Sequence, residues 1–234
     1  MKQYLPDSFI FYKPKDVVSG DFPWMFVKDD EIYVAAVDCT GHGVPGALMS
    51  FIGHFTLNQI LASEKLPTAG ATLDLLHQNV QQTLRQDTGD SKSRDGMDIA
   101  LCRINLKKKE LHFSGAHRPL YYLKQENEGI AFNEVKADRY PIGGFHYKNR
   151  EKFRNHVIPF NKGESIFFFT DGLPDQFGGP DGKTKFMSVR VQDFIKQNTR
   201  LQMNEIGSLL QREFEQWKGN HKQMDDVLLI GIRF

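Results

Sequence analysis

The sequence predicts an α+β fold in which helices cover antiparallel β-sheets. Long helical segments in the middle of the sequence lie between blocks of apolar, strand-like runs, and the regular strand–helix alternation of a parallel sheet does not occur. With 234 residues, of which 40% are hydrophobic and 19 are Phe, the chain can bury a sizeable core. We expect one domain over residues 1–234, because acidic positions of the same kind come from both ends of the sequence.

Composition argues against several classes of protein. The formal net charge is +1, so no global basic field indicates nucleic acid or an anionic membrane as a partner. The two cysteines, Cys39 and Cys102, are too few for a disulfide framework, and a reducing cytoplasm is the expected location. The sequence has no apolar stretch of about 18 residues and no signal peptide before the first predicted strand. A membrane-bound sensor upstream of Met1 in a longer natural protein stays open.

Apolar runs bounded by turn residues predict the strands, and residues 1–7 are predicted to be a loop. The predicted strands cover residues 9–13, 22–27, 33–37, 97–105, 110–114, 120–124, 166–169 and 227–232. The runs between residues 97 and 124 fit a β-meander. The run at 166–169 is apolar throughout, as expected for a strand buried on both faces. Residues 125–155 are charged and only weakly patterned.

Helical periodicity predicts a helix that begins after Gly43, with Pro45 in its first turn. Its large apolar residues recur at i, i+3 and i+4 and are expected to face the core rather than a partner. They are Val44, Ala47, Leu48, Phe51, Ile52 and Phe55.

A second helix is predicted over residues 71–86, and an exposed polar loop at 87–95 follows it. Two further helices are predicted after a Gly-rich loop at 178–185, and Gly219 would end the last one. The inward-facing residues are Leu73, Leu76, Val80 and Leu84 in the second helix, and Ile206, Leu209, Leu210, Phe214 and Trp217 in the last.

The strand runs at 22–27 and 33–37 are predicted to form a hairpin. If Asp29 and Asp30 are its two-residue loop, paired residues have numbers that sum to 59. Asp21 and Asp38 then lie opposite each other, with Cβ atoms about 5 Å apart. Because like charges repel there, a cation beside or between them is the simplest explanation.

Four acidic positions share one context, since each lies at the end of an apolar run: Asp21, Asp38, Asp171 and the pair Asp225 and Asp226. Oxygen ligands without a His or Cys cluster suit hard cations such as Mg²⁺ or Mn²⁺ and disfavour zinc. Two such ions could activate a water for attack on phosphorus. The alternative is that these are ordinary turn aspartates, since Asp is common in turns.

Six motifs resemble, in order, those of the SpoIIE/RsbU-type serine phosphatase domains, a bacterial branch of the metal-dependent type 2C protein phosphatases. They are VSGDF at 18–22, DCTGHGVPGA at 38–47, GMDIAL at 96–101, SGAHRPL at 114–120, FTDG at 169–172 and QMDDV at 223–227. Each motif alone is weak, but the ordered set is specific and spans nearly the whole chain. Residues 175–180 and 217–219 resemble a subgroup that is often attached to sensor domains.

The resemblance implies two stacked antiparallel β-sheets flanked by helices, an α-β-β-α sandwich of the type 2C phosphatase kind, with two Mn²⁺ or Mg²⁺ ions at one end. By motif position, Asp38 would bridge both ions and the backbone carbonyl of Cys39 would bind one of them. Asp171 and Asp225 would complete the other ion's ligands. Asp21 would hold water on the metals or bind directly.

Other residues in these motifs have less certain roles. Asp226 would point away from Asp225 if the strand is already extended there, so it ranks second as a ligand. Asp98 matches a family position. It could make one face of its strand polar, or it could bind a metal ion that arrives later. His42 is separated from Asp38 and Cys39 by two extra residues, so we expect it to pack at the helix start rather than act as a general acid. A catalytic role for the Cys39 thiol is not expected.

His117 and Arg118 lie on a predicted turn between strands. An Arg near the site could grip phosphate, although a surface turn is the favoured interpretation. The loop at 178–185 could be a substrate-facing flap or simply a solvent-exposed loop.

The resulting prediction is a phosphoserine/phosphothreonine protein phosphatase. The expected substrate is a phosphorylated STAS-type anti-sigma-factor antagonist in bacterial partner-switching signalling. Regulation by an upstream sensor or coiled-coil segment and a homodimer are expected possibilities, without nucleic acid or direct membrane contact. The alternatives are a non-catalytic pseudophosphatase that binds a partner, and a metal-dependent phosphohydrolase of small molecules. The intact set of acidic residues argues against the first, and only the resemblance argues against the second.

Overall fold

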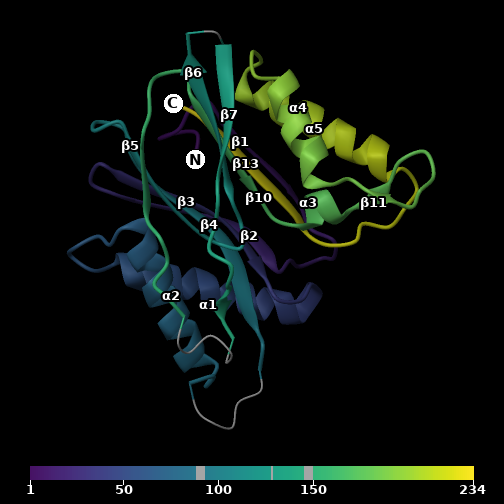
Figure 1. Ribbon diagram of the computed structural model, residues 1–234. Helices are drawn as coiled ribbons and strands as arrows, with labels where there is room; N and C mark the ends of the chain where they lie inside the picture. The colour runs from purple at the N-terminus through teal and green to yellow at the C-terminus, as the bar shows by residue number, and fades with distance from the viewer. Residues whose placement is uncertain (88–92, 128, 145–149) are drawn as a thin grey trace.

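Two antiparallel β-sheets lie together at the centre of the fold, and helices cover their outer faces (Figure 1). The structure, a computed structural model, describes residues 1–87, 93–127, 129–144 and 150–234. Residues 88–92 of the loop predicted at 87–95 lie outside these ranges, as do residues 128 and 145–149. The arrangement confirms the predicted α+β class with two antiparallel sheets.

The first sheet has the strand order β2-β3-β4-β5-β9, and β8 pairs with β4. Its strands are β2 (Asp21–Lys28), β3 (Glu31–Cys39), β4 (Gly96–Asn105), β5 (Glu110–Ala116), β8 (Ile142–Gly143) and β9 (His156–Pro159).

The second sheet has the order β1-β13-β10-β6-β7. Its strands are β1 (Ser8–Lys13), β6 (Leu120–Glu126), β7 (Gly129–Val135), β10 (Ser165–Phe169) and β13 (Val227–Arg233). A small separate hairpin pairs β11 (Phe177–Gly178) with β12 (Thr184–Lys185).

The helices lie on the two outer faces of this sandwich. They are α1 (Gly43–Leu61), α2 (Ala69–Thr83), α3 (Gly172–Asp175), α4 (Ser188–Gln197) and α5 (Met203–Lys218). In Figure 1, α1 and α2 lie together on one side of the sandwich and α4 and α5 on the other. No helix in the described ranges is both long enough and apolar enough to cross a bilayer.

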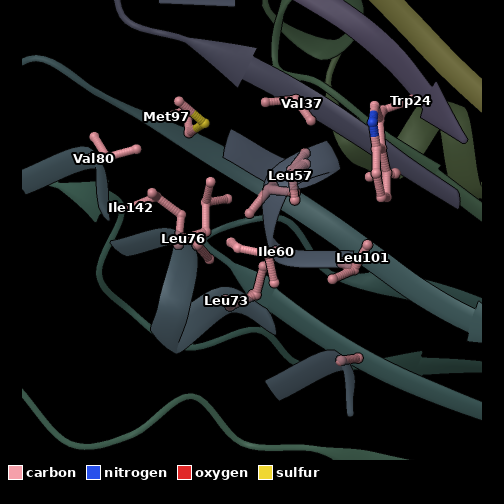
Figure 2. Close-up of a cluster of buried hydrophobic side chains, with 14 of the residues drawn as sticks. Trp24, Val37, Leu57, Ile60, Leu73, Leu76, Val80, Met97, Leu101 and Ile142 are labelled. Carbon is pink, nitrogen blue, oxygen red and sulfur yellow. The ribbon is translucent and has the colours of Figure 1, made fainter. Parts of the chain in front are cut away.

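Three layers of buried apolar side chains hold the sandwich together, because successive residues of a strand point to opposite faces. In β3, Val37 packs toward α1 and α2, whereas Val34 faces the second sheet. Figure 2 shows the first layer, where Val37 and Met97 of the sheet lie near Leu57 of α1 and Leu76 of α2. The second layer fills the space between the sheets, and the third lies between the second sheet and helices α4 and α5.

One strand prediction was wrong, and one strand lies where no strand was predicted. The β-meander ends after β5, because the chain then crosses to the other sheet, where β6 pairs with β10 and β7. The weakly patterned region 125–155 contains β7, an edge strand whose side chains are largely exposed, which explains the absence of a clear apolar alternation. The chain passes from the first sheet to the second at residues 117–119, and this turn forms part of the candidate site.

Most of the face of α1 that was expected to be buried is exposed, although Ala47 and Ile52 are partly buried. Val44, Leu48, Phe51 and Phe55 are between 61% and 72% exposed. The buried face instead combines Gly46 and Gly53 with large apolar side chains such as Leu57, Ile60 and Leu61. A Cβ atom at Gly53 would lie 3.0 Å from the Met97 side chain. The helix therefore lies close to the sheet at its glycines, and its two phenylalanines, Phe51 and Phe55, point outward.

This orientation predicts unequal effects of two Phe substitutions. Phe51→Ala is expected to change the free energy of unfolding by less than about 1 kcal/mol, because the side chain is exposed. The same change at Phe214, which is fully buried against the second sheet, should cost about 3–5 kcal/mol. Urea unfolding of both variants measures the difference. Equal losses at the two positions would contradict the placement of α1.

Candidate metal centre

The predicted hairpin register is confirmed and places three carboxylates in one row. Asp21 of β2 pairs with Asp38 of β3, and Asp38 pairs with Asp98 of β4. The turn contains Asp29 and Asp30, and Asp29 has a φ of +54°, the left-handed conformation that favoured two-residue hairpin turns require. The row lies at one end of the first sheet, where β2 begins and β3 ends.

The second sheet brings Asp171 and Asp225 to the same place. Asp171 follows β10 and Asp225 precedes β13, which are adjacent antiparallel strands. The backbone N–H of Asp171 lies 3.4 Å from Asp38 Oδ2, so the two sheets meet at these carboxylates. A cavity of about 320 Å³ opens here. Its acidic and cysteine lining residues are Asp38, Cys39, Asp98, Asp171 and Asp225.

Asp21 lies opposite Asp38 but is buried beside the cavity rather than lining it. Its side chain is almost fully buried, and Oδ2 has no hydrogen-bond partner among the described residues. Burial, followed by the nearby Asp38 carboxylate, raises the pKa of Asp21. A buried polar atom without a partner is costly, so an ionised Asp21 calls for a cation or a further donor at Oδ2.

Burial also raises the pKa values of the two residues at the end of β3. The pKa of Asp38 is raised by burial and by Asp171 and Asp98, while Arg118 opposes the shift. The pKa of the Cys39 thiol is raised, again chiefly by burial. The thiol therefore stays protonated near neutral pH, which agrees with the expectation that it has no catalytic role.

Arg118 lies inside the site, so the favoured interpretation of a surface turn was wrong for this residue. Its side chain is 17% exposed, and Nη2 lies 2.7 Å from Asp171 Oδ2, 2.8 Å from Asp98 Oδ2 and 3.1 Å from Asp38 Oδ2. His117 is more exposed, and its Nδ1 lies 2.9 Å from Asp98 Oδ1. This hydrogen bond to Asp98 is the main reason that the pKa of His117 is raised.

The change of sheet after β5 explains why Arg118 reaches the acidic residues. His117 has a φ of +58° and donates its backbone N–H to the carbonyl of Asp138. The chain turns sharply here and leaves the first sheet for the second, between the two groups of carboxylates. A β-meander would have kept residues 117–119 within one sheet, and therefore the sequence pattern alone did not reveal the role.

Asp226 holds the loop before Asp21 rather than facing the cavity. Its carboxylate accepts hydrogen bonds from the backbone N–H groups of Lys15 and Gly20, and both N···O distances are 2.7 Å. The residue is almost fully buried, whereas its neighbour Asp225 is only partly buried and lines the cavity. Asp226 therefore positions the start of β2.

Close packing of glycines fixes the start of α1 against this loop. A Cβ atom at Gly20 would lie 2.4 Å from the carbonyl oxygen of Gly41, and one at Gly46 would lie 2.3 Å from the same oxygen. Ser50 adds a hydrogen bond from its hydroxyl to the carbonyl oxygen of Gly20. His42 occupies the N-cap position of α1 and pairs with Asp16, as expected for a structural residue.

The loop at 178–185 is a small hairpin, and its described residues do not contribute to the lining of the acidic cavity.

The residues present fit hard divalent cations. The cavity is lined by carboxylates, and the orphaned Asp21 oxygen lies behind them, which is a donor set of oxygens that Mg²⁺ and Mn²⁺ prefer. Among the described residues, no group of three or more His, Cys, Asp or Glu side chains already has the arrangement of a metal cage. The cation at the centre of the carboxylates is the Arg118 guanidinium.

Comparison with known proteins gives consistent results. The family model of stage II sporulation protein E (SpoIIE) matches residues 28–234. Phosphoserine phosphatase RsbU of Bacillus subtilis (strain 168) is 27% identical over 165 residues, which are 69% of this chain and 44% of that protein. The chain thus spans less than half the length of that curated relative.

Solved structures share the fold. The SiaA-PP2C domain of Pseudomonas aeruginosa superimposes with a TM-score of 0.84 at 28% identity. The match covers 100% of this chain and 92% of the SiaA-PP2C chain. RsbX, solved in complex with magnesium, has a TM-score of 0.64 at 13% identity. The match covers 97% of this chain and 94% of the RsbX chain. At 13% identity the RsbX likeness concerns the fold alone.

The family model covers far more than half of the chain and includes Asp38, Asp98, Asp171 and Asp225, whereas Asp21 precedes the matched residues. The chain therefore belongs to the SpoIIE family, and it is similar in sequence to phosphoserine phosphatase RsbU and in fold to the SiaA-PP2C domain.

Proposed function

We propose that this chain is a Mn²⁺- or Mg²⁺-dependent phosphoserine/phosphothreonine protein phosphatase. The observation that carries the proposal is the meeting of Asp38, Asp98 and Asp171, from two different sheets, at one point beside an open cavity. Holding like charges together costs free energy, so a site for cations is a physical reason for this arrangement. Family membership supports phosphate ester hydrolysis as the use of that site.

The proposed ligands are the residues identified in the sequence. Asp38 would bridge two ions, the Cys39 carbonyl would bind one, and Asp171 and Asp225 would bind the other, with Asp21 behind them. When bound, the ions would lower the pKa of a water and neutralise phosphoryl oxygens. The chain would hold the phosphate at the cavity mouth, where Arg94 and Arg118 are the lining guanidinium groups. Asp226 and Ser50 would keep the start of β2 in place.

The substrate class is proposed to be a phosphoprotein. The curated relative RsbU is described as a phosphoserine phosphatase. We propose a phosphorylated STAS-type anti-sigma-factor antagonist as the substrate, in partner-switching signalling in the cytoplasm. An upstream sensor or coiled-coil segment is the proposed regulator, and homodimerisation belongs to the same proposal.

The experiment compares phosphate release from a phosphoserine-containing STAS protein with release from p-nitrophenyl phosphate, both with millimolar Mn²⁺. We expect kcat/KM for the phosphoprotein to exceed that for the small ester by at least about 100-fold, because remote contacts contribute binding free energy in the transition state. The variant Asp181→Asn is a matched control, since Asp181 is an exposed turn residue. Equal kcat/KM values would favour a small-molecule phosphohydrolase. Mn²⁺ binding without hydrolysis of either substrate would favour a non-catalytic binding module.

A further inference from the structure

The Arg118 guanidinium occupies the point at which the carboxylates of the candidate site converge. A single nitrogen, Nη2, lies between 2.7 and 3.1 Å from oxygens of Asp38, Asp98 and Asp171. This nitrogen carries only two hydrogens, so three carboxylates surround a group that can donate two hydrogen bonds. The excess of oxygens resembles the surroundings of a metal ion more than those of an ordinary Arg–Asp pair.

We propose that Arg118 is a built-in competitor for the divalent cations of this site and thereby sets its metal affinity. The proposal rests on the proposed function, since it concerns the same carboxylates. Arg118 and a divalent cation use the same oxygens of Asp38 and Asp171, and the two positive groups repel each other at this separation. Metal binding therefore requires the guanidinium to leave these two carboxylates.

The backbone of Arg118 is fixed, so only the side chain can move. The backbone N–H of Arg118 donates a hydrogen bond to the carbonyl of Ala116 at an N···O distance of 2.7 Å. The N–H of the preceding His117 donates to the backbone carbonyl of Asp138. The guanidinium is held less completely, because its Nε is buried without a hydrogen-bond partner among the described residues. A side chain with an unsatisfied buried donor loses less when it changes its position.

Asp98 would keep the displaced guanidinium nearby. This carboxylate uses Oδ1 for His117 and Oδ2 for Arg118, so its pairing with Arg118 does not depend on Asp38 or Asp171. Arg118 also lines the open cavity. A guanidinium released from Asp38 and Asp171 would therefore direct its free N–H groups toward an arriving phosphate, which it can bind in a bidentate manner.

A purely structural ion pair makes a different prediction. If Arg118 only neutralises the cluster, its removal lowers stability and leaves more repulsion among the carboxylates, without a change in which oxygens a metal can reach. If Arg118 competes with the metal, its removal frees those oxygens, and the metal affinity rises. The direction of the change in Mn²⁺ affinity separates the two roles.

The test is isothermal titration calorimetry with Mn²⁺ alone, at fixed pH and without substrate. Arg118→Met keeps much of the side-chain length but removes the charge, and it should bind Mn²⁺ at least about tenfold more tightly than the wild type, corresponding to about 1.4 kcal/mol. Arg118→Lys keeps the positive charge and should remain closer to the wild type. Arg103→Met is the control, because the Arg103 side chain is also 17% exposed and forms an ion pair, with Glu31 of β3. Arg103 lies toward the end of β4 that is away from Asp98. It should bind Mn²⁺ like the wild type.

A second measurement covers the case in which Arg118→Met is unfolded without metal. The Mn²⁺ concentration at which thermal stability reaches half of its maximal gain is determined for Arg118→Met and for Arg118→Gln. The proposal expects a lower concentration for both variants than for the wild type. Equal or weaker Mn²⁺ binding by both neutral variants overturns the role of Arg118 but leaves the proposed function intact. If none of the proteins binds Mn²⁺, the metal site itself is wrong and both proposals fail.

Discussion

Asp38→Asn is expected to lower Mn²⁺-dependent phosphate release by at least about 10³-fold. Asp38 stands between Asp21 and Asp98 in the register and contacts Arg118 and the backbone of Asp171. It is thus the carboxylate that connects the two sheets at the cavity. Asparagine keeps the shape of the side chain but removes the charge that would bridge two ions, so Mn²⁺ affinity should fall together with activity.

The measurement pairs phosphate release from the phosphoserine protein with Mn²⁺ calorimetry for the wild type and Asp38→Asn. Circular dichroism checks that the variant is folded, and Asp181→Asn again serves as the carboxylate control at an exposed turn. Because the pKa of Asp38 is raised by burial, loss of its charge should not destabilise the fold in chelator. Retention of metal-dependent activity within tenfold of the wild type would refute the bridging role.

The hairpin and its carboxylate pair could be predicted because they depend on local structure. A two-residue turn at Asp29 and Asp30 fixes the register of both strands, and the register alone places Asp21 opposite Asp38. No information about the rest of the fold was needed.

The position of Arg118 could not be derived in this way, because it depends on which sheet the chain enters after β5. Apolar patterning identifies strands but does not say which strands pair. The SGAHRPL motif marked residues 114–120 as part of the family pattern, and that was the only sequence signal near Arg118. The acidic partners come from β3, β4 and the end of β10, so the site exists only after both sheets are assembled.

The predicted orientation of α1 was wrong for a different physical reason. The prediction followed the apolar stripe that contains Phe51 and Phe55, because its residues recur at helical spacing. The buried stripe contains Gly46 and Gly53, which allow the helix to approach the carbonyl of Gly41 and the Met97 side chain. It also carries Leu57, Ile60 and Leu61, which are buried in the first core layer. Close backbone approach and burial of these aliphatic side chains together favour the observed orientation.

Asp21 should make the stability of the protein fall with rising pH when a chelator removes divalent cations. Burial and the neighbouring Asp38 raise its pKa from 3.8 to about 10. Between these values the folded chain holds a proton that the unfolded chain has released, so a rise in pH favours unfolding. The free energy of unfolding should therefore decrease over this range, by at most about 1.4 kcal/mol per pH unit for one proton.

Asp21→Asn is expected to remove the contribution of Asp21 to this slope, because asparagine does not titrate. The raised pKa of Asp38 acts in the same direction, so a smaller slope should remain in the variant. Saturating Mn²⁺ should reverse the effect in the wild type, since cations bind the ionised carboxylates that high pH provides. Urea unfolding in EDTA between about pH 5 and pH 9, which lies between the two pKa values of Asp21, measures both slopes. Parallel slopes for the wild type and Asp21→Asn would show that Asp21 is already ionised in the folded chain, with a partner other than a bound metal ion.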